Sequence, residues 1–134
     1  MRPVSRDGTS TATRAAVAAF ALGRAAFGVA LIARPERIGR GWLGEVVDQP
    51  ATQAAIRGLG ARDLALSAGA LAAVARKTGV RTWLLAAVAS DLTDIAAAVV
   101  ARDSLPPRAV PGTVALAGGS AVAAVILAAR SERQ

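Results

Sequence analysis

The feature that most constrains the fold of this chain is a run of 21 residues without a charge, from Ala109 to Ala129. As an α-helix rising about 1.5 Å per residue, it is long enough to cross the hydrocarbon core of a bilayer, which is about 30 Å thick. Its interior polar side chains are Thr113 and Ser120. A helix of a soluble bundle needs a polar face over much of its circumference, and this segment has none. We therefore expect a membrane-spanning helix over residues 111–130.

Three further apolar segments have the length of a spanning helix, at about residues 12–33, 51–76 and 81–102. Each is interrupted by charge. In segment 81–102, seven strong hydrophobic residues contribute about −2 to −4 kcal/mol to insertion, while two central aspartates cost about 5 to 7 kcal/mol. This helix should not insert alone. The sequence therefore predicts an all-α fold, a four-helix transmembrane bundle in a single domain covering residues 1–134, whose interior charges are paired between helices.

Proline and glycine mark the ends of these segments. Arg34-Pro35 ends the first, because proline disfavours helical geometry in the preceding residue. Lys77-Thr-Gly79 joins the second and third, and we expect Gly79 to supply the helix end. Pro106 and Pro107 cannot continue the third helix.

The two longest segments outside the predicted helices are residues 1–11 and 34–50. Residues 1–11 are polar and predict a flexible cytoplasmic tail. Residues 34–50 form the longest connection, in which apolar and charged residues alternate. Trp42 and its neighbouring arginines favour a short stretch at the level of the lipid headgroups, with Trp42 as an interfacial anchor, or an ordinary loop with a buried tryptophan.

The composition excludes several kinds of chemistry. The chain has no cysteine and no histidine, which excludes disulfides, thiol chemistry, the usual zinc ligands and every histidine-dependent triad. We expect no cofactor and no metal. The net charge of +7 does not predict a nucleic-acid partner, because the arginines are scattered over short segments and aromatic residues do not alternate with them.

The basic residues at and beyond the helix ends predict an orientation. One side of the membrane would carry eight of them, Arg2, Arg6, Arg14, Arg76, Lys77, Arg81, Arg130 and Arg133. The other side would carry five, Arg34, Arg37, Arg40, Arg102 and Arg108. Because cytoplasmic loops are enriched in Lys and Arg, we expect both termini in the cytoplasm and a multi-pass protein of the bacterial inner membrane.

Six charged residues lie well inside the predicted helices. Arg24, Arg62, Asp63 and Asp91 are near the middle of the membrane, and Arg57 and Asp94 lie nearer its outer side. Three arginines and three aspartates cancel, as a low-dielectric interior requires. Ordered by depth, they pair as Arg57 with Asp94, Arg62 with Asp91, and Arg24 with Asp63. They form a candidate ligand-binding or ionic cluster.

Helical geometry adds detail to this cluster. Asp91 and Asp94 are three residues apart and share a helix face. Arg62 and Asp63 are adjacent, point about 100° apart and should not satisfy each other, so helix 51–76 should face two neighbouring helices. Gly58 and Gly60 either permit a neighbour or a ligand to approach the helix backbone closely or loosen the helix turn.

Four motifs carry a resemblance that extends over about residues 14–130. They are Leu22-Gly-Arg-Ala-Ala-Phe-Gly28, Pro35-Glu-Arg-Ile-Gly-Arg-Gly-Trp-Leu-Gly44, Arg57-Gly-Leu-Gly-Ala-Arg-Asp63 and Ser90-Asp-Leu-Thr-Asp94. Together they resemble small uncharacterised four-helix membrane proteins of high-GC bacteria, similar in outline to the DoxX-like group. The resemblance implies a four-helix membrane fold. The chain lacks the cysteine that a thiol-redox role would need.

Three functional hypotheses follow. The first is a binding protein or accessory subunit whose charged cluster receives a lipid or another polar ligand, with membrane lipid and a homo-oligomer or larger membrane complex as partners. The alternative is a small proton-linked transporter or carrier. The third is a membrane-embedded enzyme acting on a lipid, because two carboxylates on one helix face can hold Mg²⁺. A purely structural role is the alternative to all three: the cluster would then only fix the register of the helices.

Overall fold

The structure is a computed structural model that describes residues 10–132. This part of the chain folds into five α-helices and two short 3-10 helices, without a strand. The all-α prediction is therefore confirmed. Of the predicted tail, residues 1–9 lie outside the described residues, and Thr11 already belongs to the first helix.

Four of the helices are long and apolar enough to cross a membrane. They are α1 (Thr11–Ala33), α3 (Pro50–Arg76), α4 (Val80–Val100) and α5 (Ala109–Glu132). Their bounds agree with the predicted segments to within two residues at each end. Helix α4 ends at Val100 rather than Arg102, since the next residues tighten into the 3-10 helix η2 (Arg102–Ser104).

Local side-chain and backbone features explain where these helices begin and end. The Ser10 hydroxyl accepts a hydrogen bond of 3.2 Å from the backbone N–H of Thr13 and so caps α1. Helix α3 begins with Pro50 in its first turn, where a missing N–H costs nothing. The predicted role of Gly79 as the end of this helix is wrong. Lys77 adopts the left-handed conformation there, with φ 56°, and Gly79, also left-handed, precedes α4.

The longest connection is itself helical. It forms α2 (Pro35–Leu43) and the 3-10 helix η1 (Gly44–Asp48). The guanidinium of Arg40 forms an exposed ion pair with Asp48, which fixes α2 against η1. The hydrogen bonds from Arg40 to this carboxylate raise the pKa of the guanidinium above its ordinary value.

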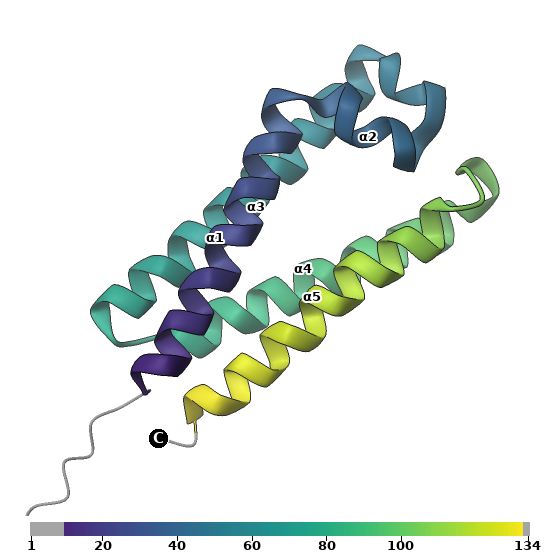
Figure 1. Cartoon of the computed structure of the whole chain (residues 1–134). Helices are drawn as coiled ribbons and strands as arrows, with labels where there is room; N and C mark the ends of the chain where they lie inside the picture. Colours follow the sequence, from purple (N-terminus) through teal and green to yellow (C-terminus); the bar gives the residue numbers. More distant parts are fainter. Residues whose placement is uncertain (1–9, 133–134) are drawn as a thin grey trace, which may run out of the picture.

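The four long helices form two antiparallel hairpins (Figure 1). Helices α1 and α3 make one, with α2 and η1 at their tip, and α4 and α5 make the other. The hairpins meet at the end where α1 starts and α5 stops, and they diverge toward α2 (Figure 1). At the closed end Arg81 of α4 forms an exposed ion pair of 2.5 Å with Glu132 of α5.

Each end of the molecule has its own apolar core. At the closed end, Val17, Leu84 and Leu127 belong to a cluster to which all four long helices contribute. At the α2 end, the buried residues Leu31, Val47 and Ile56 come from α1, η1 and α3, and Ile38 and Leu43 of α2 pack against them. All four long helices therefore share the core at one end, while the core at the other end contains residues of the first hairpin alone.

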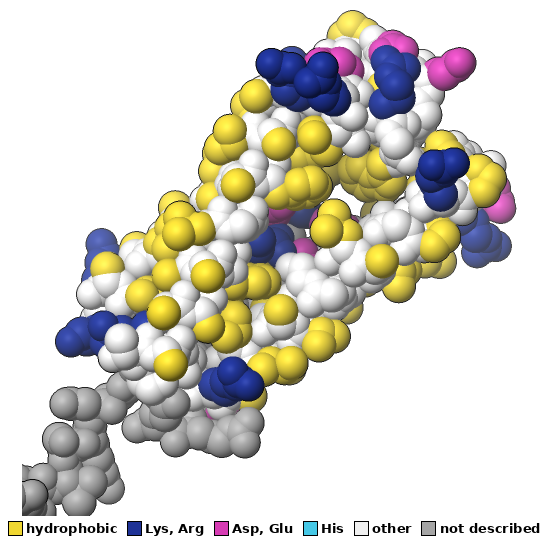
Figure 2. Space-filling model, viewed as in Figure 1, with side chains coloured by type: hydrophobic (Ala, Val, Ile, Leu, Met, Phe, Trp, Pro, Cys, Tyr) yellow, Lys and Arg dark blue, Asp and Glu magenta, His cyan; other side chains and the backbone are white. Residues whose placement is uncertain are grey.

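Much of the remaining surface of the long helices is apolar (Figure 2). Leu22, Leu92 and Val122 are between 56% and 60% exposed. A soluble bundle would bury such side chains or replace them with polar ones, whereas lipid tails solvate them. The charged side chains on the face drawn in Figure 2 gather mostly at the two ends of the molecule, with a further group at the bottom of the opening between the hairpins.

Candidate functional site

Arg24 is the centre of the charged cluster. From α1, its Nη1 donates to both carboxylate oxygens of Asp91 on α4, at 2.7 and 2.9 Å, and to the Ser120 hydroxyl on α5, at 2.8 Å. Its Nη2 donates to Oδ1 of Asp63 on α3, at 2.8 Å. One guanidinium thus links all four long helices.

The groups around Arg24 are removed from solvent. Side-chain exposure is 11% for Arg24, 8% for Asp63 and 5% for Asp91. The predicted pairing of Arg24 with Asp63 is confirmed by the ion pair between them. Charges this deeply buried are tolerated because each is met by an opposite charge in hydrogen-bonding geometry.

The other two predicted pairings are wrong. Arg62 forms a two-pronged ion pair with Asp94, both bonds measuring 2.7 Å, instead of pairing with Asp91. Its Nη2 also lies 3.4 Å from Oδ1 of the adjacent Asp63. The expectation that these neighbours in sequence cannot reach each other therefore fails as well, because the long arginine side chain bends back over its own helix. As predicted, α3 faces two helices: Asp63 binds α1 and Arg62 binds α4.

Arg57 does not belong to the cluster. It is exposed, and its Nε donates to the carbonyl of Ile32, at 3.2 Å, in the last turn of α1. The final carbonyls of a helix lack intrahelical donors, and a cation is favourable at that end of the helix dipole. Arg57 thus caps α1 from α3.

Only one of the two predicted close-approach glycines is in contact with a neighbour. A Cβ atom on Gly60 would lie 2.5 Å from the carbonyl oxygen of Gly28, and one on Gly28 would lie 2.7 Å from that of Gly60. Helices α1 and α3 therefore cross backbone to backbone at this pair. Gly58 has open space around it, so no neighbouring helix approaches its backbone there.

The diverging hairpins leave a cleft of about 550 Å³ between them. Its apolar wall comes from α1, α2, α3 and α5, and includes Phe27, Leu31, Ile38, Trp42, Leu59 and Leu116. Arg108 also lines it, beside the start of α5. This volume lies within the range of small-molecule binding sites, which are mostly apolar with a few polar groups in fixed positions.

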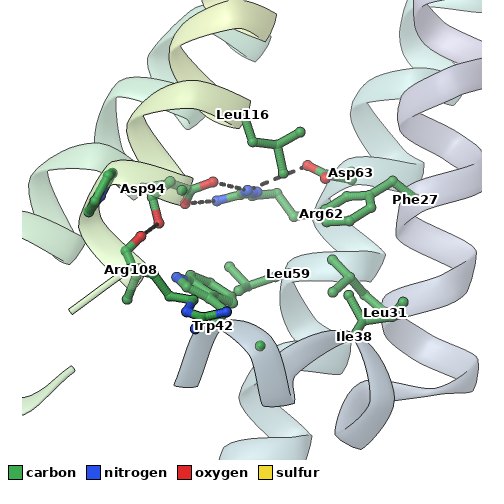
Figure 3. A pocket seen from close by; sticks show the side chains of 15 residues that line it. Phe27, Leu31, Ile38, Trp42, Leu59, Arg62, Asp63, Asp94, Arg108 and Leu116 are labelled. Atoms are coloured by element: carbon green, nitrogen blue, oxygen red, sulfur yellow. Dashed lines mark hydrogen bonds and ion pairs between the residues drawn. The ribbon is translucent and has the colours of Figure 1, made fainter. Parts of the chain in front are cut away.

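One end of the cleft is polar. There it is lined by Arg62, Asp63 and Asp94, whose side chains lie across the opening from Trp42 and Leu59 (Figure 3). Both oxygens of Asp94 are bound by Arg62. Asp63 uses only Oδ1 for its two ion pairs, so within residues 10–132 its Oδ2 has no hydrogen-bond partner. The cleft thus combines an apolar wall with one unused carboxylate oxygen.

Trp42 lies on α2, and its half-buried indole forms part of the cleft wall. Its Nε1 is buried and has no hydrogen-bond partner among the described residues. The interfacial-anchor role stays a prediction, since it concerns lipid that surrounds the protein.

Sequence patterns did not identify three of these participants. Ser120 completes the bonds of Arg24, and a signal was present, because it is one of the two polar residues inside an otherwise apolar helix. Phe27 and Arg108 had no comparable signal, since their place in the cleft depends on how far the hairpins diverge.

Asp91 and Asp94 were considered as a metal-binding pair, but they bind different arginines. No group of three or more potential metal ligands occurs in the part of the chain described.

Comparison of the chain with protein-family models, with curated proteins and with solved structures gives no match. The functional argument therefore depends on the geometry of the cleft and the cluster.

Proposed function

We propose that the protein is a multi-pass membrane protein that binds an amphipathic small molecule in the cleft between its two helical hairpins. The single observation that carries this proposal is the cleft of about 550 Å³ whose apolar wall ends at charged side chains. An apolar cavity alone would be filled by any lipid tail. A fixed polar group at its end selects an occupant with a polar end of its own.

The membrane setting is part of this proposal. Four helices of spanning length support it, as do the exposed leucines and valines on their outer faces. The distribution of basic residues supports an orientation with both termini in the cytoplasm and the α2 end of the cleft on the outer side of a bacterial inner membrane.

Four glycines offer a matched test of the cleft. Gly41 and Gly112 line it, and a Cβ atom at either position would meet no other group within 4 Å. Leucine can therefore be placed there without a clash and would occupy part of the cavity. Gly58 and Gly119 have equally open surroundings but do not line the cleft, so Gly58→Leu and Gly119→Leu are the controls.

The readout is the small molecule retained by the protein in mild detergent, measured by native mass spectrometry. We expect a bound mass in the unchanged chain and in both controls, and its loss in Gly41→Leu and Gly112→Leu. Retention of the same mass by all four variants would show that the ligand lies elsewhere, and the cleft would then not be its site.

A second candidate function is a small proton-linked carrier. It is favoured by three intramembrane carboxylates, Asp63, Asp91 and Asp94, which Arg24 and Arg62 hold together between the cleft and the protein interior. Intramembrane carboxylates often belong to proton pathways in membrane proteins. Proton flux across liposomes that contain the protein, lost in Asp63→Asn, would favour the carrier over a binding protein.

A further inference from the structure

The charges of the buried cluster do not cancel. With Arg57 directed to the end of α1, two guanidinium groups, those of Arg24 and Arg62, face three carboxylates. The cluster therefore carries one negative charge in excess. An uncompensated charge in a low-dielectric environment is costly, so this excess calls for a cation.

The position of the unused acceptor shows where that cation would lie. Each oxygen of Asp91 accepts from Arg24, and each oxygen of Asp94 accepts from Arg62. Oδ2 of Asp63 accepts from no group in residues 10–132, although the side chain is only 8% exposed. Asp63 also lines the cleft. An acceptor without a donor, on a side chain this little exposed, here adjoins a cavity of ligand size.

We infer that the natural occupant of the cleft is a single-chain amphipathic amine, whose ammonium group donates a hydrogen bond to Oδ2 of Asp63. Its apolar chain would lie against Phe27, Leu59 and Leu116. This inference rests on the proposed function and specifies the chemistry of the ligand.

Other ligand classes fit the polar end less well. An anion would add to the negative excess, and the Nη atoms of Arg62 already bind Asp94. A neutral headgroup leaves the excess charge in place, and a quaternary ammonium has no N–H to donate. A cavity of about 550 Å³ suits a ligand of drug size rather than a whole two-chain phospholipid. Arg108 also lines the cleft but is exposed, where solvent and counterions screen its charge.

Three probes with the same chain test the inference: dodecylamine, dodecanol and dodecanoate. At pH 7 the amine is cationic, the alcohol neutral and the acid anionic. Binding of each to the full chain is followed by the thermal unfolding midpoint in non-ionic detergent. Each shift is compared with that of the cleft-filled Gly112→Leu variant, so that effects of the probe on the micelle cancel. We expect dodecylamine to bind at least about tenfold more tightly than dodecanol, and dodecanoate most weakly.

Asp63→Asn removes the charge and keeps an amide oxygen that can still accept from Arg24. In this variant we expect the amine to lose its advantage over the alcohol. Asp103→Asn removes an equal charge from an exposed aspartate outside the cleft and should keep the preference. If Asp63→Asn fails to fold, the preference of the unchanged chain among the three probes still decides the question.

The outcomes separate the inference from the proposed function. Equal binding of amine and alcohol, lost for both in Gly112→Leu, would overturn the ammonium assignment and leave a ligand-binding cleft. No cleft-dependent binding of any probe would overturn both. Displacement of dodecylamine by phosphatidylethanolamine but not by phosphatidylcholine would support an ammonium site while overturning the single-chain assignment, because the amine would then be a lipid headgroup.

Discussion

Arg24 holds the four long helices together through one planar group. Its two terminal nitrogens reach Asp63, Asp91 and Ser120 on three different helices. A lysine could not copy this arrangement, because an ammonium is a compact charge without the fork of the guanidinium. Burial makes the loss of Arg24 costly, since the two carboxylates that it serves cannot turn to water.

We expect Arg24→Met to lower the free energy of unfolding by about 3 to 5 kcal/mol, because it leaves Asp63 and Asp91 buried without their main partner. The measurement is an equilibrium unfolding titration with denaturing detergent in mixed micelles. Arg57→Met is the matched control. It removes an exposed guanidinium that makes one hydrogen bond to a backbone carbonyl, and should cost no more than about 1.5 kcal/mol. Equal losses in the two variants would contradict the central role of Arg24.

The misassigned pairs show what residue order can and cannot provide. Depth along a helix follows from sequence position, but the direction of a side chain around the bundle depends on which helices are neighbours. Asp91 and Asp94 share a face only loosely, being about 60° apart around the helix axis. That difference is enough for Asp91 to point to Arg24 and Asp94 to Arg62.

A double-mutant cycle tests the corrected pair. We expect Arg62→Leu and Asp94→Leu to be coupled by about 1 to 2 kcal/mol, because their two-pronged ion pair is mostly shielded from solvent. The same cycle between Arg57 and Asp94, which depth alone would pair, should give coupling within about 0.5 kcal/mol of zero. Unfolding free energies of the single and double variants provide both values. If Asp94 were coupled more strongly to Arg57 than to Arg62, the pairing predicted from depth would be correct after all.

At the level of helices, the crossing of α1 and α3 depends on glycines. The sequence indicated two candidates two positions apart, and these point about 160° apart around the helix. Only one of them can face a given neighbour, and Gly60 is the one that meets Gly28. Without the partner helix in view, the pattern could not distinguish Gly58 from Gly60.

We expect Gly60→Leu to destabilise the protein strongly, by about 3 kcal/mol or more, because the new side chain would meet backbone rather than a movable side chain. Gly58→Leu lies in the same helix with open space around it and should change stability by less than about 1 kcal/mol. Thermal unfolding midpoints in one detergent compare the two variants. A tolerated leucine at position 60 would mean that α1 and α3 can separate without loss.

Sequence periodicity predicted the long helices well and the short ones poorly. An apolar segment of about twenty residues has little choice but to form a helix in a membrane, because its backbone N–H and C=O groups must find their hydrogen-bond partners within the protein. Helix α2 has nine residues, including Gly39 and Gly41, and glycine is a weak helix former. Its helical state is supported by packing, since a Cβ atom at Gly39 would collide with Ile56 and Val47.

At the scale of the whole molecule, the cleft is the feature that the sequence predicts least well. The charged residues at its end were all identified from their unusual place in apolar segments. Its volume depends on the divergence of the two hairpins, which is set by cores of unequal extent at the two ends. No local pattern in the sequence encodes that divergence.

The orientation of the chain in the membrane is predicted from the distribution of all its basic residues. The absence of cysteine makes it accessible to labelling at single sites. Thr78 lies in the connection between α3 and α4, and Ser104 lies in η2, at the opposite end of α4; both are exposed. Eight basic residues flank the predicted cytoplasmic side against five on the other, an excess that predicts a cytoplasmic position for Thr78.

We therefore expect a membrane-impermeant maleimide to label Ser104→Cys in intact spheroplasts and to label Thr78→Cys only after the membrane is opened. Labelling of both variants after denaturation provides the control for expression. The reverse pattern would keep four spans but invert the orientation, which would place the α2 end of the cleft on the cytoplasmic side. Labelling of both sites from outside would mean that α4 does not cross the membrane. The free-energy cost of inserting its two aspartates into the membrane would then exceed the stabilisation from their ion pairs with Arg24 and Arg62.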